Sequence, residues 1–382
     1  MKKIAIIGAG ISGLFIANLF KRNPNYQIEI YEKNNSIGLE EGYGVQLSVN
    51  SIKLLNEIGF KKLQNVEKFT PKKINFYANQ SLNKICELDI SDFNLEDCRY
   101  TTLKRSTLIN FLKEDLADLI KTGYNISKIN EQKKTTKLYF ENSKSVECDY
   151  LIISDGVFSK SKNLISNNQI NVKYNNTIAI RGTISERSLG KINEKNISLF
   201  LGSNFHYVIY PTSSIGDFNY IGILNYHLKS KELLNYTLFD DYSFISKIFN
   251  KIPESKYLPI NKLENIKLFP IFISNNFYKP MYKNTFFIGD AFYAFSPSLA
   301  QGASQSIEGA YELFKSITNN TQGKFFIDRI KKLKMVNNRS KFNQFAFHLS
   351  SPLMVFFRNI ILKRLVKNKK FLENYLGKIY RN

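Results

Sequence analysis

The sequence predicts an α/β fold in which a Rossmann-type dinucleotide-binding domain carries an inserted antiparallel β-sheet domain and a C-terminal helical segment. Three observations predict it. Residues 2–32 follow the order strand, glycine-rich turn, helix, strand, which is typical of a parallel βαβ unit. Residues 70–100 and 166–276 contain short alternating strands rich in aromatic residues, which indicates an antiparallel sheet. From residue 346 the pattern is helical and ends in basic residues.

The first βαβ unit has the residue types that a dinucleotide requires. Residues 4–7 form a short apolar strand that leads directly into Gly8, Gly10 and Gly13. The first glycine permits the tight turn, the second lets the backbone approach a pyrophosphate, and the third lets the helix at 14–20 pack closely. A second strand at 27–31 then delivers Glu32, whose carboxylate is placed to accept hydrogen bonds from the adenosine ribose.

The remaining elements follow from periodicity. A glycine-punctuated connection at 34–47 leads to a helix at 52–58, and residues 73–77 form a strand of the inserted sheet. A single apolar face predicts a helix over 105–120, and 150–153 reads as a buried strand ending at Asp155 and Gly156. We expect further strands at 177–184, 197–201, 205–210, 219–225 and 286–290, and then a helix reaching residue 314. The predicted domain limits are 1–69, 101–165 and 277–345 for the dinucleotide-binding domain, 70–100 and 166–276 for the substrate domain, and 346–382 for the tail.

Composition narrows the function classes. The 382 residues carry a formal net charge of +22, but Lys, Asn and Ile are abundant throughout, so we expect no nucleic-acid partner. The three cysteines lack metal-ligand spacing and leave one unpaired, which favours a reduced cytoplasmic location and no metal site. Residues 4–20 are interrupted by the glycine turn, which argues against a signal or membrane segment.

The C-terminal tail leaves two interpretations open. Leu353, Phe356, Phe357, Ile360 and Ile361 fall on one helical stripe, and residues 361–382 contain seven Lys/Arg and one Glu. We favour packing of this stripe on the protein's own core, because Arg364 interrupts it. The alternative is peripheral contact with an anionic membrane, which would make the protein membrane-associated.

Three separated stretches carry a family resemblance. They are residues 8–13 with Glu32, residues 148–156 with Ser159, and residues 289–290 with Pro297 and 300–303. Together they resemble the single-component FAD-dependent aromatic hydroxylases. Residues 42–50 and 299–303 resemble the GxGIQLSPN and LAQGA segments of the salicylate hydroxylase and 3-hydroxybenzoate 6-hydroxylase branch, and Arg181-Gly182 and Tyr210-Pro211 resemble its RG and YP signatures. That family is related to ubiquinone-biosynthesis hydroxylases.

The resemblance implies a Rossmann-type FAD-binding domain and a set of site residues. The implied FAD-binding residues are Gly8, Gly10, Ser12, Gly13, Glu32, Lys33, Gly44, Val45, Arg105, Asp155, Gly156, Asp290, Pro297, Gly302 and Ala303. Arg181 and Tyr210 are the candidate catalytic residues for holding a phenol, against the alternative of a structural arginine and a core tyrosine. His206 is a further candidate base, although a lone strand histidine is more often structural. Two positions depart from the family pattern: Tyr293 replaces the His of GDAAH, and Lys162 replaces an arginine.

The function implied is an FAD-dependent, NAD(P)H-using monooxygenase that hydroxylates a small phenolic or other aromatic substrate with dioxygen, through a flavin hydroperoxide. One alternative is a ubiquinone-biosynthesis hydroxylase acting on a polyprenylated phenol at the membrane surface, suggested by the tail. Another, of a different class, is a flavin-binding protein without monooxygenase turnover, suggested by Tyr293 and Lys162.

Overall fold

A five-stranded parallel sheet forms the centre of the computed structural model, which describes residues 1–38, 43–166, 172–185, 195–252, 262–274 and 284–381. Its strand order is β18-β12-β1-β2-β8. The bounds are β1 (Lys2–Ile7), β2 (Tyr26–Glu32), β8 (Ile120–Thr122), β12 (Tyr150–Ile153) and β18 (Thr285–Phe287). Strand β1 pairs in parallel with both β2 and β12, so the βαβ unit predicted for residues 2–32 is confirmed.

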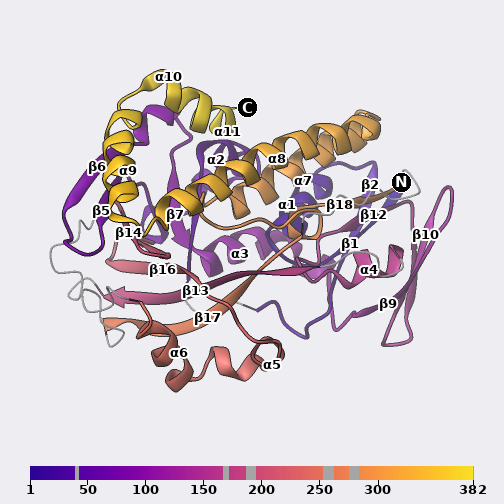
Figure 1. Cartoon of the computed structure of the whole chain (residues 1–382). Helices are drawn as coiled ribbons and strands as arrows, with labels where there is room; N and C mark the ends of the chain where they lie inside the picture. Colours follow the sequence, from indigo (N-terminus) through magenta and orange to yellow (C-terminus); the bar gives the residue numbers. More distant parts are fainter. Residues whose placement is uncertain (39–42, 167–171, 186–194, 253–261, 275–283, 382) are drawn as a thin grey trace.

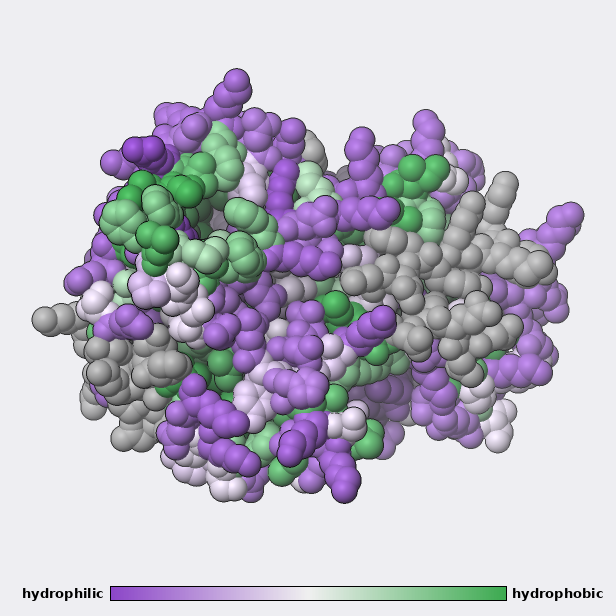
Figure 2. Space-filling view, in the orientation of Figure 1, coloured by the Kyte–Doolittle hydropathy of each residue, from purple (hydrophilic) through white to green (hydrophobic). Residues whose placement is uncertain are grey.

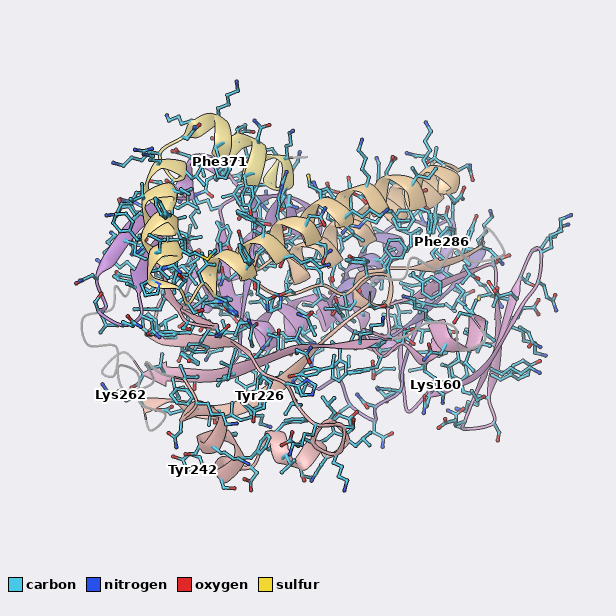
Figure 3. All side chains as sticks on the ribbon, viewed as in Figure 1. Lys160, Tyr226, Tyr242, Lys262, Phe286 and Phe371 are labelled. Carbon is cyan, nitrogen blue, oxygen red and sulfur yellow. The ribbon has the colours of Figure 1, made fainter. Side chains whose placement is uncertain are left out.

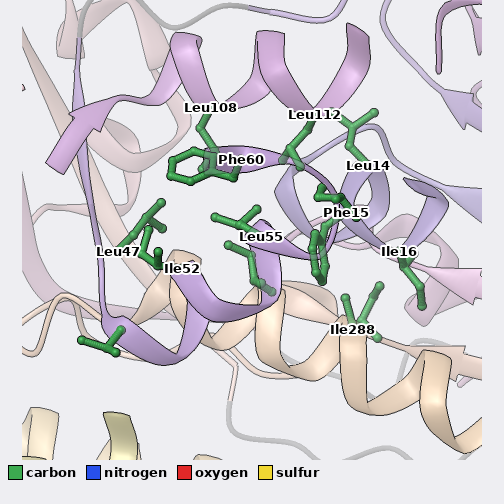
Figure 4. Close-up of a cluster of buried hydrophobic side chains, with 14 of the residues drawn as sticks. Leu14, Phe15, Ile16, Leu47, Ile52, Leu55, Phe60, Leu108, Leu112 and Ile288 are labelled. Carbon is green, nitrogen blue, oxygen red and sulfur yellow. The ribbon is translucent and has the colours of Figure 1, made fainter. Parts of the chain in front are cut away.

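Helices of this domain pack on the sheet or on one another through apolar side chains. They are α1 (Ile11–Lys21), α2 (Val49–Asn56), α3 (Arg105–Lys113), α4 (Lys160–Ile165), α7 (Gly302–Thr318) and α8 (Gln322–Phe347). Figure 4 shows Phe15 of α1, Leu55 of α2 and Leu108 of α3 converging in one buried cluster. The strand β1 is apolar because both faces of the sheet are covered: helices such as α1 pack on one face, and side chains such as Ile126 and Leu138 pack on the other.

The second large sheet has seven strands in the order β17-β13-β16-β15-β14-β5-β6. The strands are β5 (Lys73–Ala78), β6 (Lys84–Asp89), β13 (Lys173–Ser185), β14 (Ile197–Gly202), β15 (Phe205–Pro211), β16 (Asp217–Asn225) and β17 (Glu264–Ile273). All neighbours are antiparallel except β14 and β5. Helices α5 (Ser230–Leu234) and α6 (Tyr242–Phe249) lie below this sheet in Figure 1. The predicted inserted antiparallel sheet is therefore present; the predicted limit at 276/277 lies outside the described residues, as does Gly42.

The structure corrects the region 105–148. The predicted helix over 105–120 ends at Lys113, because a 3-10 helix at Glu114–Leu119 follows and Ile120 must be extended to pair with Ile30. A three-stranded antiparallel sheet then precedes β12; its strands are β9 (Ile126–Glu131), β10 (Thr136–Phe140) and β11 (Ser145–Cys148). This sheet was not predicted from the sequence. A further small sheet joins β3 (Gly44–Leu47), β7 (Thr101–Lys104) and β4 (Lys68–Phe69).

The C-terminal segment consists of α9 (Pro352–Leu365), α10 (Lys369–Leu372), a π-helical turn at Glu373–Gly377 and α11 (Lys378–Tyr380). Its end is docked: Tyr380 is buried with its ring 5.3 Å from that of Phe93. The stripe on α9 is not docked, since Leu353, Phe356 and Phe357 are each more than half exposed. Our preference for a core-packed stripe is therefore wrong. Within the described ranges, no helix has the length and apolar composition needed to cross a bilayer.

Candidate active site

The glycine-rich turn joins β1 to α1 at the carboxyl end of the sheet. Gly8 has a φ of 98°, and a Cβ there would lie 2.6 Å from the Ser154 carbonyl oxygen. A Cβ at Gly13 would overlap the Gly8 carbonyl and the Ser154 hydroxyl. Gly10 differs, because no described atom lies within 4 Å of its Cβ position. The first and third glycines are thus required for packing, while the second leaves open space over the helix N-terminus.

Glu32, at the end of β2, stabilises this turn through hydrogen bonds. Its carboxylate accepts hydrogen bonds from the backbone N–H groups of Ala9 and Asn34, both at 3.0 Å. Lys33 beside it is exposed. Ser12 is buried, and its hydroxyl lies 2.6 Å from the position of a Cβ on Gly289, so it packs against the turn that carries Asp290. The two carboxylate oxygens of Glu32 retain lone pairs that could accept hydrogen bonds from a ribose.

The end of β12 brings a second polar group to the same edge. Asp155 accepts from the Ser161 N–H at 3.1 Å, and burial raises the pKa of its carboxyl. Gly156 follows with a φ of 82° and open space at its Cβ position. Lys162, the departure from the family arginine, is buried with its ammonium 3.4 Å from the Ser274 hydroxyl. Burial lowers the pKa of Lys162 to about 8, and nearby Asp155 opposes that shift.

The third part of the site opens into a cavity of about 860 Å³. Asp290, Pro297, Gly302 and Ala303 line one end of it. Gly302 begins α7, and no side chain of the N-cap residue caps the helix, so its first N–H groups carry positive potential. The Asp290 side chain is exposed to the cavity, and the surrounding protein raises its pKa to about 6, an effect that the cation of Arg105 opposes.

Residues from the seven-stranded sheet and β3 line another part of the same cavity. They include Gly44, Val45, Arg181 and Tyr210. The Arg181 guanidinium carbon lies 5.9 Å from the ring centre of Tyr43 and 5.3 Å from that of Phe269. A Cβ at Gly44 would lie 2.8 Å from the Tyr210 ring, so the glycine permits the close approach of the two sheets. Arg181 and Tyr210, distant in sequence, therefore meet in one cavity.

Burial keeps the tyrosines of this cavity protonated. It raises the pKa of Tyr210, and the charge of Arg181 only partly opposes that effect. Two residues that line the cavity were not predicted from the sequence: Gln46 and Tyr100. The Tyr100 hydroxyl donates to the Gln46 side-chain oxygen at 2.8 Å. Gln46 lies in the segment 42–50 that carried part of the resemblance, and alternation along β3 could have identified it as facing inward.

His206 does not have the environment of a catalytic base. It is buried, and its Nδ1 lies 2.7 Å from Nε2 of His348, so one of the two rings must donate to the other. Burial lowers its pKa well below the usual value, and His348 adds to that effect. Tyr293, unlike His206, is not among the described residues that line the cavity; it is buried with its ring 6.2 Å from that of Phe295.

The described residues fit a bound FAD. Gly10, Gly156 and Gly302 all lack a neighbour within 4 Å of the Cβ position, and they lie at strand ends and helix starts where anionic or polar ligand groups bind. The family comparison agrees with this geometry: residues 1–326 match the family model described as "FAD binding domain". The chain belongs to that FAD-binding family. Its dinucleotide cofactor is FAD.

Curated relatives of this FAD-binding chain are named as monooxygenases or hydroxylases. The 6-hydroxynicotinate 3-monooxygenase of Pseudomonas fluorescens is 24% identical over 161 residues, which is 41% of this chain and 41% of that protein. Salicylate hydroxylase of Pseudomonas putida is 22% identical over 254 residues, 62% of this chain and 54% of that protein. The chain thus matches only about two-fifths to one half of the length of these relatives.

Solved structures share the fold of the FAD-binding chain almost end to end. Klebsiella pneumoniae HpxO, complexed with FAD and uric acid, has a TM-score of 0.83 at 16% identity, covering 98% of this chain and 97% of that chain. A salicylate hydroxylase substrate complex has a TM-score of 0.78 at 16% identity, covering 100% and 95%. At these identities the likeness shows the fold alone.

Proposed function

We propose that the protein is an FAD-dependent monooxygenase that uses NAD(P)H and dioxygen to hydroxylate a small phenolic or related heteroaromatic substrate, through a flavin hydroperoxide. One observation carries the proposal: Asp290 and the N-terminus of α7 share a single, mostly apolar cavity with Arg181 and Tyr210. The names of the two curated relatives, a 6-hydroxynicotinate 3-monooxygenase and a salicylate hydroxylase, support it.

In this proposal, the glycine turn and Glu32 hold the ADP half of FAD, while Asp290 accepts from the ribityl chain. The N–H groups at Gly302 and Ala303, at the start of α7, would offer positive potential to the negative charge of a reduced flavin. When bound, FAD supplies the reduction and oxygen chemistry. The apolar side chains of the cavity, such as Leu199, exclude water from it.

Arg181 and Tyr210 would position the substrate. The guanidinium stabilises an ionised phenol or a ring carboxylate, because a charged hydrogen bond in an apolar cavity is stronger than a neutral one. Tyr210 keeps its proton at neutral pH, since burial raises its pKa, so its hydroxyl can donate to a substrate oxygen. Together they would hold the ring in one orientation relative to the flavin.

The proposal is tested by aerobic NAD(P)H oxidation with phenols and hydroxylated N-heterocycles, measuring hydroxylated product and hydrogen peroxide separately. Product formed in proportion to NAD(P)H consumed is the expected result. Purified protein that retains FAD yet yields only hydrogen peroxide with every ring would favour the flavin-binding alternative. Protein that takes up no FAD at micromolar concentration would end the proposal. No comparison supports the polyprenylated phenol alternative, and the cytoplasmic location stays a prediction.

A further inference from the structure

The exposed side chains of α9 and of the end of α8 form an apolar surface. Seven large, exposed hydrophobic side chains fall between residues 342 and 361: Phe342, Phe345, Leu353, Met354, Phe356, Phe357 and Ile361. We call this set the α9 face. Figure 2 shows an apolar cluster over the part of the molecule where α9 lies in Figure 1. A contiguous apolar surface of this kind marks an interaction site, whereas single exposed apolar residues are ordinary.

Part of the α9 face lines one entrance to the cavity. Phe342, Phe345, Met354, Phe357 and Ile361 are exposed and also line the 860 Å³ cavity that contains Asp290 and Arg181. The inner wall near this entrance continues through apolar residues of the C-terminal segment. An apolar molecule could therefore pass from the α9 face to the candidate active site along apolar side chains.

Cations lie next to the α9 face. Lys363, Arg364, Lys367, Lys369 and Lys370 are all exposed, at the end of α9 and the start of α10. The only acidic residue after position 346 is Glu373, which pairs with Arg381 at 3.0 Å. An apolar helix face flanked by unbalanced cations is the arrangement of a helix that lies in an anionic membrane interface.

The helix is held in place by the rest of the protein. Arg358 is only 8% exposed, and its guanidinium donates to the Ala346 carbonyl at 3.4 Å, so α9 is tied to the end of α8. Tyr380 anchors the chain after it. Docking would therefore not have to order a free segment, which removes an entropic cost.

We propose that the α9 face docks on an anionic membrane surface, with its apolar side chains in the interface and the neighbouring cations at the lipid headgroups. A second copy of the chain is a poorer occupant, because a symmetric contact would bring two sets of five cations together. Docking would turn the cavity entrance toward the bilayer. In a step that rests on the proposed function, the substrate would then be an apolar aromatic compound dissolved in the membrane.

The test is cosedimentation of the FAD-loaded protein with vesicles of phosphatidylcholine plus phosphatidylserine, compared with phosphatidylcholine alone. We expect binding to the anionic vesicles that weakens with salt. The double variant Leu353→Gln, Phe356→Gln should reduce bound protein roughly tenfold or more. Neither residue lines the cavity, so FAD content and NAD(P)H oxidation with a water-soluble phenol should equal those of the wild type.

The matched control is Leu234→Gln, Tyr242→Gln, which removes two exposed side chains on α5 and α6. Figure 3 shows Tyr242 on the opposite side of the molecule from Phe371 of α10. This control should bind vesicles as the wild type does. Equal binding by the α9 variant and the wild type would overturn the proposal, as would wild-type self-association that the α9 variant loses without any vesicle binding. Failure of the proposed function would appear separately, as absent FAD or absent product in solution.

Discussion

Asp290→Asn separates a cofactor role of this residue from a structural one. The carboxyl faces the cavity, yet the surrounding protein raises its pKa from 3.8 to about 6. The FAD-free folded protein thus holds this proton more tightly than the unfolded chain does. Its free energy of unfolding must therefore fall as the pH rises from about 4 to about 6, and change no further from this source above that range.

The size of the effect follows from the shift. A carboxyl fully enclosed by protein would lose about 3 kcal/mol over this range, at 1.36 kcal/mol for each pKa unit. Because the Asp290 side chain is exposed to water in the cavity, screening reduces this to about 1 kcal/mol. Asparagine has no proton to lose, so the FAD-free Asp290→Asn protein should gain stability relative to the wild type between pH 4 and pH 7. The melting temperature should rise by about 1 to 2 °C at pH 7.

FAD affinity should move in the opposite direction. If Asp290 accepts from a ribityl hydroxyl, replacing the carboxylate by an amide should weaken FAD binding roughly tenfold at pH 8, the cost of exchanging a charged acceptor for a neutral one. Thermal unfolding of the FAD-free protein and fluorescence titration with FAD measure the two effects. Asp118→Asn, at an exposed position of the 3-10 helix, is the control and should change neither. A stability difference independent of pH, together with unchanged FAD affinity, would refute the reasoning.

Substitutions at four other positions test the remaining parts of the structure. Gly10→Ala should leave the melting temperature of the FAD-free protein unchanged but weaken FAD binding, since its Cβ position is open, whereas Gly13→Ala should lower both because its Cβ would overlap backbone; equal behaviour in melting and titration experiments would contradict this. Arg181→Ala should lower product per NAD(P)H roughly tenfold or more at normal FAD content, with partial recovery in Arg181→Lys; full coupling in the alanine variant would make the arginine structural. Tyr380→Ala should destabilise the protein by about 3 kcal/mol or more, read as a lower melting temperature, because a buried ring is lost; an unchanged value would show that the C-terminal end is not docked.

Local chemistry made part of this structure predictable. The glycine turn, Glu32 and the strands around them depend on neighbouring residues and on strand periodicity, and the sequence contains both. Arg181 and Tyr210 were found only through a family resemblance, because strands β13 and β15 belong to a sheet whose order cannot be read along the chain. Gln46 and Tyr100 show the same limit: they are 54 residues apart, and only the folded chain brings their side chains within 2.8 Å.

The predicted helix is too long because an α-helix and a 3-10 helix can give similar spacings of apolar residues. Residues 114–119 keep an apolar face with Leu116 buried, but they form a 3-10 helix, whose three-residue turn also places apolar residues on one side. What ends the helix is long-range: Ile120 pairs with Ile30 as the edge strand of the parallel sheet. No residue near position 113 signals this, since neither glycine nor proline stands there.

The prediction that the apolar stripe on α9 packs on the core is wrong, because the basic residue that interrupts the stripe does not determine which side of the helix is buried. The interruption at Arg364 predicts a core-facing helix followed by a solvated end, yet the stripe itself is exposed and the buried basic residue on α9 is Arg358. A core-packed helix would bury Phe356 and Phe357 and expose its arginines; here the arginine is turned inward to the Ala346 carbonyl and the phenylalanines are turned outward. Burying an arginine while exposing two aromatic rings is unfavourable in water alone. An apolar partner that covers the rings would remove this cost, and the five exposed cations that follow fit the anionic surface that we propose as that partner.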